Sequence, residues 1–350
     1  MIEEKENRMG VMPVGKLLFS MSTPMVISFL VQSLYNIVDS IFVARYSPDA
    51  LAAVSLAYPI QILMIAVSVG TGVGVNALLS RLLGEGKKDR AKVTADNAVL
   101  LAIIASIAFA IFGAIGTKAF FDAQTNSESI RSLGYSYLSI VSIFSFGLIL
   151  EVTYERILQS TGKTIYNMIT QGIGAIINII LDPILIFGLL GAPKMGVAGA
   201  AIATVAGQII AMILSFIFNM KYNEDVDISL GKHIFKPDFI IIKDIYKVGI
   251  PSIAMQSMST LMMLGLNKIL VRYSDMAVNV LGIYYKLQSF VFMPIFGLNN
   301  GMTPIVAYNY GARNKDRIMK ALKYSFLSSV VIMVIGTAIF WIFPKELMIL

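Results

Sequence analysis

The sequence predicts an all-α polytopic membrane protein, a two-lobe helical bundle made of parallel six-helix repeats whose second lobe ends after its third helix. Of the 350 residues, 57% are hydrophobic and only 14% are charged, whereas globular proteins average about 25% charged residues. Several apolar runs are longer than the roughly 18 residues that a membrane-crossing helix needs. The second observation is an internal duplication.

The duplication relates two long stretches of the chain. Residues 24–90 recur without a gap as residues 251–317. The repeat aligns Pro24 with Pro251, Gly70 with Gly297, Gly74 with Gly301, Gly84 with Gly311, and Arg90 with Arg317. Glycines and charges that match in one register are typical of a repeated structural unit and are not expected from apolar composition alone.

Nine membrane spans are predicted from the apolar runs, and several are long enough to require tilt or kinks. They cover residues 17–44, 52–80, 96–117, 134–158, 164–190, 196–220, 246–272, 278–306 and 321–343. An even number of spans separates Pro24 from Pro251. Both copies therefore enter the membrane in the same direction, which predicts a parallel repeat.

The spans divide the chain into three predicted parts. Residues 1–221 form an N-terminal six-helix lobe, and residues 222–245 form a cytoplasmic inter-lobe linker. Residues 246–350 form the first half of a C-terminal lobe, with three helices. Since the first lobe has six helices, three more are expected to follow. We therefore expect the sequence to be a fragment or a truncated product.

The placement of Lys and Arg predicts the orientation. The segments before the first span and after each even-numbered span are rich in these residues. Such segments face the cytoplasm in multi-pass proteins, so we expect a plasma-membrane protein with a cytoplasmic N-terminus. The net charge of +7 is then explained by topology, and no nucleic-acid partner is expected.

Two acidic residues lie inside predicted spans, where ionisable side chains are expensive and usually functional. Asp39 lies in the first span, and Asp182 in the fifth. Asn178 is one turn before Asp182 on the same helix face, and Thr204 lies at a similar depth in the sixth span. An acid pair with such neighbours can hold a proton or a small hard cation.

A structural role is the alternative for these acids, with Asp39 at the membrane interface and Asp182 as a partner of Asn178. The duplication favours function, because Asp39 aligns with Leu266 in the second copy. A purely architectural acid is expected in both copies, whereas a coupling site can belong to one lobe.

Other polar residues in the spans are weaker candidates. They line a substrate cavity in one interpretation, and hydrogen-bond between helices in the other. The cavity candidates are Gln32, Tyr35, Asn36, Gln61, Gln256, Lys286, Gln288 and Asn299. Glu151, Glu155 and Arg156, at the end of the fourth span, are expected to form local ion pairs. The chain has no Cys and a single His, and no nucleophile–base pair is evident, so an enzyme and a resident cofactor are not expected.

Five motifs resemble the multidrug and toxic compound extrusion (MATE) transporters, closest to their DinF-like and MepA-like bacterial branch. They are Tyr35-Asn-Ile-Val-Asp39-Ser, Asn178-Ile-Ile-Leu-Asp182-Pro183, the small-residue stretch from Gly199 to Thr204, Gly249-Ile-Pro251 and Pro304-Ile-Val-Ala-Tyr-Asn-Tyr-Gly311. The resemblance implies two six-helix lobes around a V-shaped cavity. It also implies multidrug efflux, in which cationic amphipathic drugs leave in exchange for H⁺ or Na⁺, and hence antibiotic resistance.

The resemblance also implies a coupling site in the first lobe. Its residues map onto Asp39, Asn178, Asp182, Ala200 and Thr204. If the coupling ion is Na⁺, then Asp39, Asn178, Asp182 and Thr204 are the expected metal ligands. The acid that the NorM-like branch carries in its seventh span has no counterpart here, because residues 251–267 contain no acid.

Two other functions remain open at this stage. One is a lipid-linked oligosaccharide flippase of the same superfamily, for which several cationic cavity residues are expected and Lys286 alone is a candidate. The other is an inactive truncated remnant. The expected partners are the lipid bilayer and small cationic amphipathic drugs, with the protein acting as a monomer.

Overall fold

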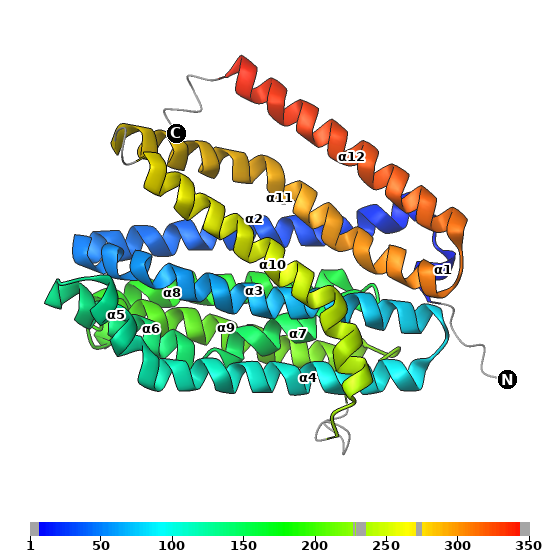
Figure 1. Ribbon diagram of the computed structural model, residues 1–350, viewed down its shortest axis with the longest axis horizontal. Helices are drawn as coiled ribbons and strands as arrows, with labels where there is room; N and C mark the ends of the chain where they lie inside the picture. The colour runs from blue at the N-terminus through cyan, green and yellow to red at the C-terminus, as the bar shows by residue number, and fades with distance from the viewer. Residues whose placement is uncertain (1–6, 227, 229–235, 271–274, 344–350) are drawn as a thin grey trace.

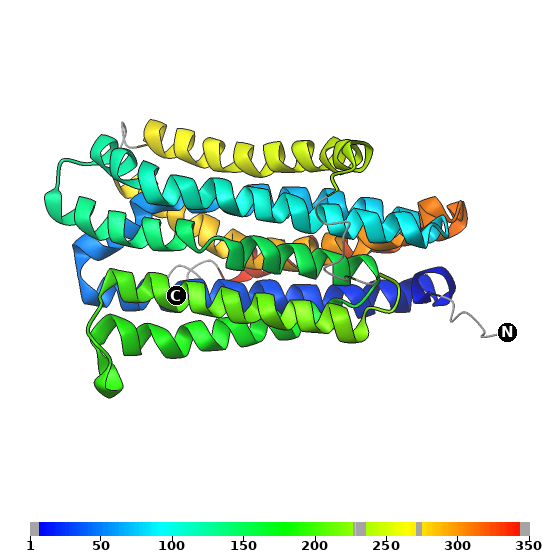
Figure 2. The same ribbon diagram turned by 90° about the horizontal axis from the view of Figure 1, so that it is seen from below.

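The computed structural model describes residues 7–226, 228, 236–270 and 275–343, and its regular elements in these ranges are all helices. Most of the long helices run side by side along one axis of the molecule (Figures 1 and 2). They are α1 (Arg8–Val11), α2 (Val14–Tyr46), α3 (Pro48–Gly84), α4 (Lys88–Ile111), α5 (Thr117–Gln124), α6 (Glu128–Ile143), α7 (Phe146–Ser160), α8 (Thr164–Phe187), α9 (Val197–Tyr222), α10 (Phe239–Leu270), α11 (Asp275–Gly311) and α12 (Lys315–Ile342).

Seven stretches of helix in the described ranges are long and apolar enough to cross a membrane, or eight if a bent pair counts as one span. They correspond to eight of the nine predicted spans. The remaining one, 246–272, overlaps α10 as far as Leu270, and α10 is not among these helices. The predicted span 134–158 is the bent pair, because α6 and α7 meet at an angle of 41°. The backbone leaves the helical conformation at Phe144, where φ is −95° and ψ is 18°.

The predicted span 96–117 is part of a longer helical rod. A π-helical turn, Phe112–Gly116, joins α4 to α5, so the rod continues from Lys88 to Gln124. This π-helical turn is a single wide turn. Such π-bulges occur as local features within α-helices. The chain is a multi-span membrane protein by the length and composition of these helices.

The duplication is visible in the contacts between helices. Gly70 of α3 packs against Ile253 of α10, and its repeat mate Gly297 of α11 packs against Val26 of α2. Val26 and Ile253 are themselves repeat mates. The α3–α10 and α2–α11 contacts therefore have the same geometry and are related by an axis along the bundle, which is the arrangement predicted from the parallel repeat.

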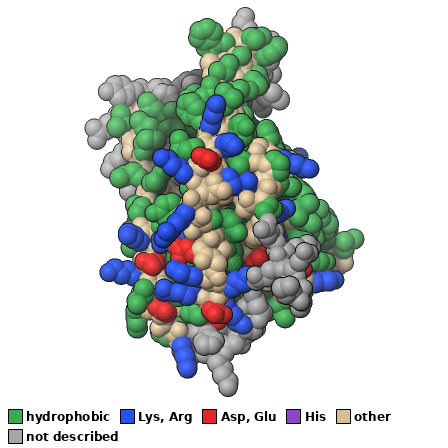
Figure 3. All heavy atoms as spheres, turned by 90° about the vertical axis from the view of Figure 1, so that its right-hand side faces the viewer, with side chains coloured by type: hydrophobic (Ala, Val, Ile, Leu, Met, Phe, Trp, Pro, Cys, Tyr) green, Lys and Arg blue, Asp and Glu red, His purple; other side chains and the backbone are tan. Residues whose placement is uncertain are grey.

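One end of the bundle, which we call the basic end, carries much of the positive charge. It includes the start of α1, the α3–α4 turn and the α11–α12 turn. Figure 3 looks onto this end, where Lys and Arg side chains gather around fewer acidic ones. Among the residues there are Arg81, Lys87, Arg313 and Lys315.

Candidate functional site

The two predicted intramembrane acids meet between α2 and α8. The carboxyl groups of Asp39 and Asp182 lie within hydrogen-bonding reach of each other. Asp182 is fully buried, with 0% of its surface exposed. One oxygen of each group, Oδ1, is buried without a hydrogen-bond partner among the described residues. Like charges this close repel strongly in a low-dielectric interior, so the pair needs a proton or a cation to remain together.

The local sequence of α8 determines the surroundings of the Asp182 side chain. Asn178 lies one turn earlier on the same face, and both side chains are buried. Pro183 follows directly and lacks an N–H, so the α8 backbone offers one hydrogen bond fewer at this depth. The helix ends at Gly188, whose φ of +76° is a left-handed conformation that suits glycine.

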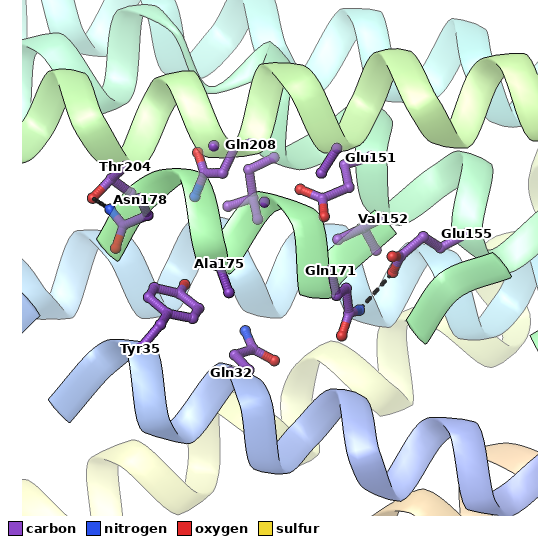
Figure 4. Close-up of a pocket in the computed structure, with 14 residues that line it drawn as sticks. Gln32, Tyr35, Glu151, Val152, Glu155, Gln171, Ala175, Asn178, Thr204 and Gln208 are labelled. Atoms are coloured by element: carbon purple, nitrogen blue, oxygen red, sulfur yellow. Dashed lines mark hydrogen bonds between the residues drawn. The ribbon is translucent and has the colours of Figure 1, made fainter. Parts of the chain in front are cut away.

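Asn178 links the acid pair to α9. Its amide contacts the Thr204 hydroxyl at 3.3 Å (Figure 4). Rotated by 180°, the amide satisfies two neighbours at once: its nitrogen donates to Asp182 Oδ2 at 3.2 Å, and its oxygen accepts from the Thr204 backbone N–H at 3.2 Å. We adopt this orientation, since amide rotamers are assigned from their hydrogen bonds.

Ala200 lies one turn before Thr204 on α9. It is fully buried within an apolar cluster that includes Val43, Ala57 and Ile186. Its side chain brings no polar atom to the acid pair. The predicted coupling residues therefore come together in space, with Ala200 contributing close packing between helices.

A cavity of about 80 Å³ lies between α2, α7, α8 and α9 (Figure 4). It begins at Tyr35, one helical turn from Asp39. Its lining residues are Gln32, Tyr35, Leu148, Glu151, Val152, Glu155, Gln171, Gly174, Ala175, Asn178, Thr204, Gly207, Gln208 and Ala211. Two of the eight cavity residues predicted from the sequence, Gln32 and Tyr35, are among them.

The other predicted cavity residues lie elsewhere. Asn36 follows Tyr35 directly, so it points to a different side of α2 and is exposed. Gln256, Gln288 and Asn299 belong to α10 and α11, which pack against α2 and α3 and not around this cavity. The side chain of Lys286 lies outside the described residues.

Gln61 forms a hydrogen bond between helices, which was the alternative to cavity lining in the sequence analysis. Its side-chain nitrogen donates to the Tyr137 hydroxyl at 2.9 Å, which joins α3 to α6. Tyr137 is buried and lies close enough to Asp39, Tyr35 and Asp182 for electrostatic interaction. Gln61 therefore supports a tyrosine beside the acid pair.

The sequence interpretation missed Glu151 and Glu155 as cavity residues. Local ion pairing was expected at this end of α7, but Glu155 accepts hydrogen bonds from Thr170 at 2.9 Å and from Gln171 at 2.7 Å. The guanidinium of Arg156 hydrogen-bonds to Gln159 and Asn300, and its interaction with Glu155 is electrostatic only.

Helical spacing groups the cavity residues of each helix onto one face. Positions 151 and 155 on α7, 171, 175 and 178 on α8, and 204, 208 and 211 on α9 recur at three, four or seven residues. Each set lies on one helix face. Periodicity indicates a shared face, but it does not say which faces of separate helices converge.

The donor set can be tested against a metal ion. Within the described residues, no group of three or more His, Cys, Asp or Glu side chains is placed to hold one. Hard cations prefer about six oxygen ligands, and the Asn178 oxygen already accepts the Thr204 N–H. The oxygens of the acid pair that have no partner among the described residues are Oδ1 of Asp39 and Oδ1 of Asp182.

One protein-family model matches most of the chain. The family model of MatE matches residues 24–184 and 251–350. The chain belongs to the MATE family. This family consists of transporters and not enzymes, in agreement with the sequence analysis, and the predicted two-lobe all-helical fold is confirmed by solved MATE structures.

The relatives of this MATE protein carry transporter names. The multidrug export protein MepA of Staphylococcus aureus is 30% identical over 328 residues, which are 92% of this chain and 70% of that protein. MepA of Staphylococcus haemolyticus is 32% identical, over 91% of this chain and 69% of that protein. An FAD transporter of Shewanella oneidensis is 28% identical, over 89% of this chain and 69% of that protein.

Two solved structures share the fold. One is an outward-facing multidrug resistance MATE family transporter of the MOP superfamily, with a TM-score of 0.90 and 27% identity, covering 98% of this chain and 75% of that one. The other is a MOP superfamily transporter from Pyrococcus furiosus, described by the reverse polarity of its binding pocket, with a TM-score of 0.87 and the same identity and coverage.

Proposed function

We propose that this MATE protein is a cation-coupled multidrug antiporter that exports cationic amphipathic compounds, with H⁺ or Na⁺ taken up at Asp39 and Asp182. The observation that carries the proposal is the contact between the buried carboxyl group of Asp182 and the half-buried one of Asp39, each with one buried oxygen lacking a partner among the described residues. The protein acts in the plasma membrane in this proposal, and the positive-inside rule supports a cytoplasmic basic end.

The geometry supports a simple coupling cycle. With a proton or cation shared between the carboxyl groups, α2 and α8 stay together at this depth. When it leaves, the two charges repel, and α2 moves relative to α8. Tyr35 lies one turn away and lines the cavity, so this movement changes the cavity. A cation shifts the equilibrium between the two shapes only by its difference in affinity for them.

Of these two ions, the arrangement around the acid pair favours H⁺. The Asn178 amide is held between Asp182 and Thr204, which leaves few free oxygens for a metal ion. A proton needs only the two carboxyl groups. Na⁺ is the alternative that transport measurements must separate.

The charge of the cavity supports a cationic substrate. Its charged lining residues within the described part are Glu151 and Glu155, both acidic. FAD, which the relative from Shewanella oneidensis is named for, carries a negatively charged pyrophosphate that such a cavity repels. A lipid-linked oligosaccharide has the same pyrophosphate, so the flippase alternative is less favoured for the same reason.

Transport by the full chain in proteoliposomes tests the proposal. Ethidium efflux is measured under an imposed H⁺ or Na⁺ gradient, with FAD as a second cargo. Asp39→Asn and Asp182→Asn are expected to abolish gradient-driven efflux. Asp122→Asn, at an exposed acid paired with Arg131 at 3.2 Å, is the matched control and should transport normally.

The outcomes separate the alternatives. Efflux that responds to pH and not to Na⁺ supports proton coupling. Normal gradient-driven efflux in both Asp39→Asn and Asp182→Asn would show that the acid pair does not couple the gradient to transport. Transport of FAD without transport of ethidium shows that the substrate class is wrong.

A further inference from the structure

Glu151 is an unusual side chain in this cavity. Only 8% of its surface is exposed, and it lines the cavity between α7 and α9 (Figure 4). None of the described residues donates a hydrogen bond to it. A buried carboxylate without a donor is strongly unfavourable unless it takes up a proton or a ligand supplies the missing partner.

A second acceptor lies one helical turn away. Glu155 accepts hydrogen bonds from Thr170 and Gln171. It is also close enough to Glu151 to interact electrostatically. The nitrogen of Gln171 is used for Glu155, and its oxygen, Oε1, is buried without a partner. This wall of the cavity therefore has an excess of hydrogen-bond acceptors.

The neighbouring positive charge makes no hydrogen bond to this wall, and its interaction with Glu155 is electrostatic only. Arg156 lies beside Glu155 in sequence, but its guanidinium donates to Gln159 and Asn300 at 2.8 and 2.6 Å. It is not among the residues that line the cavity. Gln32 and Gln208 complete the polar lining, and their amides carry no charge.

We propose that Glu151 and Glu155 form a subsite for the protonated amine or amidinium group of a transported compound. The subsite rests on the proposed function, since it assigns the recognition of cationic cargo to two residues. An amidinium presents parallel N–H donors that match a carboxylate. The cavity of about 80 Å³ holds such a head group but not a large ring system, which must lie outside it.

The lining also disfavours an inorganic cation at this place. A metal ion needs several charged or oxygen ligands around it, and the described residues include no cluster of three or more acidic or other ligating side chains suited to a metal. Apolar side chains complete the lining, which suits the carbon stem of an organic cation. They are Leu148, Val152, Ala175 and Ala211.

Binding of DAPI, a fluorescent diamidine, to the purified full chain in detergent tests the subsite. Glu151→Gln removes the charge and keeps the shape, and it is expected to weaken DAPI binding about tenfold or more. Glu155→Gln is expected to weaken it as well. Glu128→Gln, at an exposed acid in the first turn of α6, is the matched control and should bind DAPI like the parent.

Two further measurements separate binding from folding. Because Glu151 accepts no hydrogen bond from the described residues, Glu151→Gln should unfold at the same temperature as the parent or higher. A neutral dye, N-phenyl-1-naphthylamine, should bind equally to both proteins.

The possible results are distinct. If Glu151→Gln and Glu155→Gln bind DAPI as tightly as the parent, the subsite is wrong and the proposed antiport stands. If the parent binds neither DAPI nor ethidium, both the cationic substrate class and the subsite are wrong. Loss of DAPI binding with unchanged binding of the neutral dye supports the subsite.

Discussion

Gly84 and Gly311 occupy equivalent places on opposite sides of the interface between the two repeats. Gly84 packs against the backbone carbonyl of Tyr308, and Gly311 packs against that of Arg81. Arg81 and Tyr308 are repeat mates as well. A side chain at either glycine would overlap the opposing backbone, so these two residues allow α3 and α11 to meet closely at the basic end.

Gly84→Ala is expected to loosen this contact, because backbone atoms cannot move aside as a side chain does. Overpacking of this kind costs about 1–3 kcal/mol. The basic end should then open more often. A cysteine reporter measures the opening, since the natural chain has no Cys. Ser22→Cys suits this use, because Ser22 is only 4% exposed and Gly301 packs against it.

Labelling of Ser22→Cys by a polar maleimide should be slow in the parent and faster with Gly84→Ala. Gly172→Ala is the control, because a methyl group at Gly172 meets no atom within 4 Å. Equal labelling rates in all three proteins would show that the glycine contact does not close the basic end.

Asn178→Ala tests the link between the acid pair and α9. The substitution leaves Asp182 Oδ2 without the donor that the amide provides and removes the contact with Thr204 of α9. An unsatisfied buried group costs about 1–3 kcal/mol, so the melting temperature should fall. Asn36→Ala, at an exposed position of α2, should leave it unchanged. Equal melting temperatures for the two variants would contradict the assigned amide contacts.

The fold was largely predictable from the sequence because membrane helices depend on long apolar runs and the repeat fixes their pairing. The bend between α6 and α7 was not predicted, since apolar composition continues across Phe144 and only the backbone conformation breaks the span. The π-helical turn at Phe112–Gly116 was missed for the same reason: it lies inside an unbroken apolar run.

The candidate site was predictable in part. Asp39 and Asp182 stand out because ionisable residues are rare in spans, and Asn178 follows from its spacing. Glu151 was not predicted because it lies near the end of a span, where a charged residue is ordinary. Its burial depends on how α7 packs against α8 and α9, and one helix's periodicity does not contain that information.

Arg317→Lys should release the amino-terminal segment at the basic end. Arg317 donates to the carbonyl oxygens of Met9 and Met12 at 2.9 and 2.7 Å, and to Asn309 at 3.1 Å. A lysine ammonium cannot reproduce this fork of donors. Hydrogen exchange over residues 8–12 should become faster, while Arg90→Lys, at the exposed repeat mate, should not change it. Unchanged exchange in Arg317→Lys would mean that other contacts hold the segment.

Glu85 gives a pH-dependent contact outside the spans. The Lys87 ammonium donates to Glu85 at 2.6 Å and holds the pKa of this carboxyl below its usual value; partial burial opposes the effect, and Arg81 adds to it. A lowered folded-state pKa stabilises the protein above the unfolded-state pKa, and the stabilisation is lost as the pH falls through the folded-state value.

Glu85→Gln should therefore lower stability at neutral pH by less than about 1 kcal/mol, as exposed ion pairs do. The difference from the parent should shrink below the ordinary glutamate pKa of 4.5 and vanish once Glu85 is protonated. Thermal unfolding of both proteins from pH 7 downward measures it. A difference that grows as the pH falls would reverse the assigned sign.

Tyr137→Phe removes one hydroxyl beside the acid pair and leaves the aromatic ring in place. The hydroxyl accepts a hydrogen bond from Gln61 at 2.9 Å, and a hydrogen bond of this kind contributes about 0.5–1.5 kcal/mol. The Gln61 amide also loses its partner, so the melting temperature should fall. Tyr135→Phe is the matched control, because Tyr135 is 43% exposed on the same helix. If Tyr137→Phe and Tyr135→Phe have the same melting temperature, the hydrogen bond between Gln61 of α3 and Tyr137 of α6 does not stabilise the lobe.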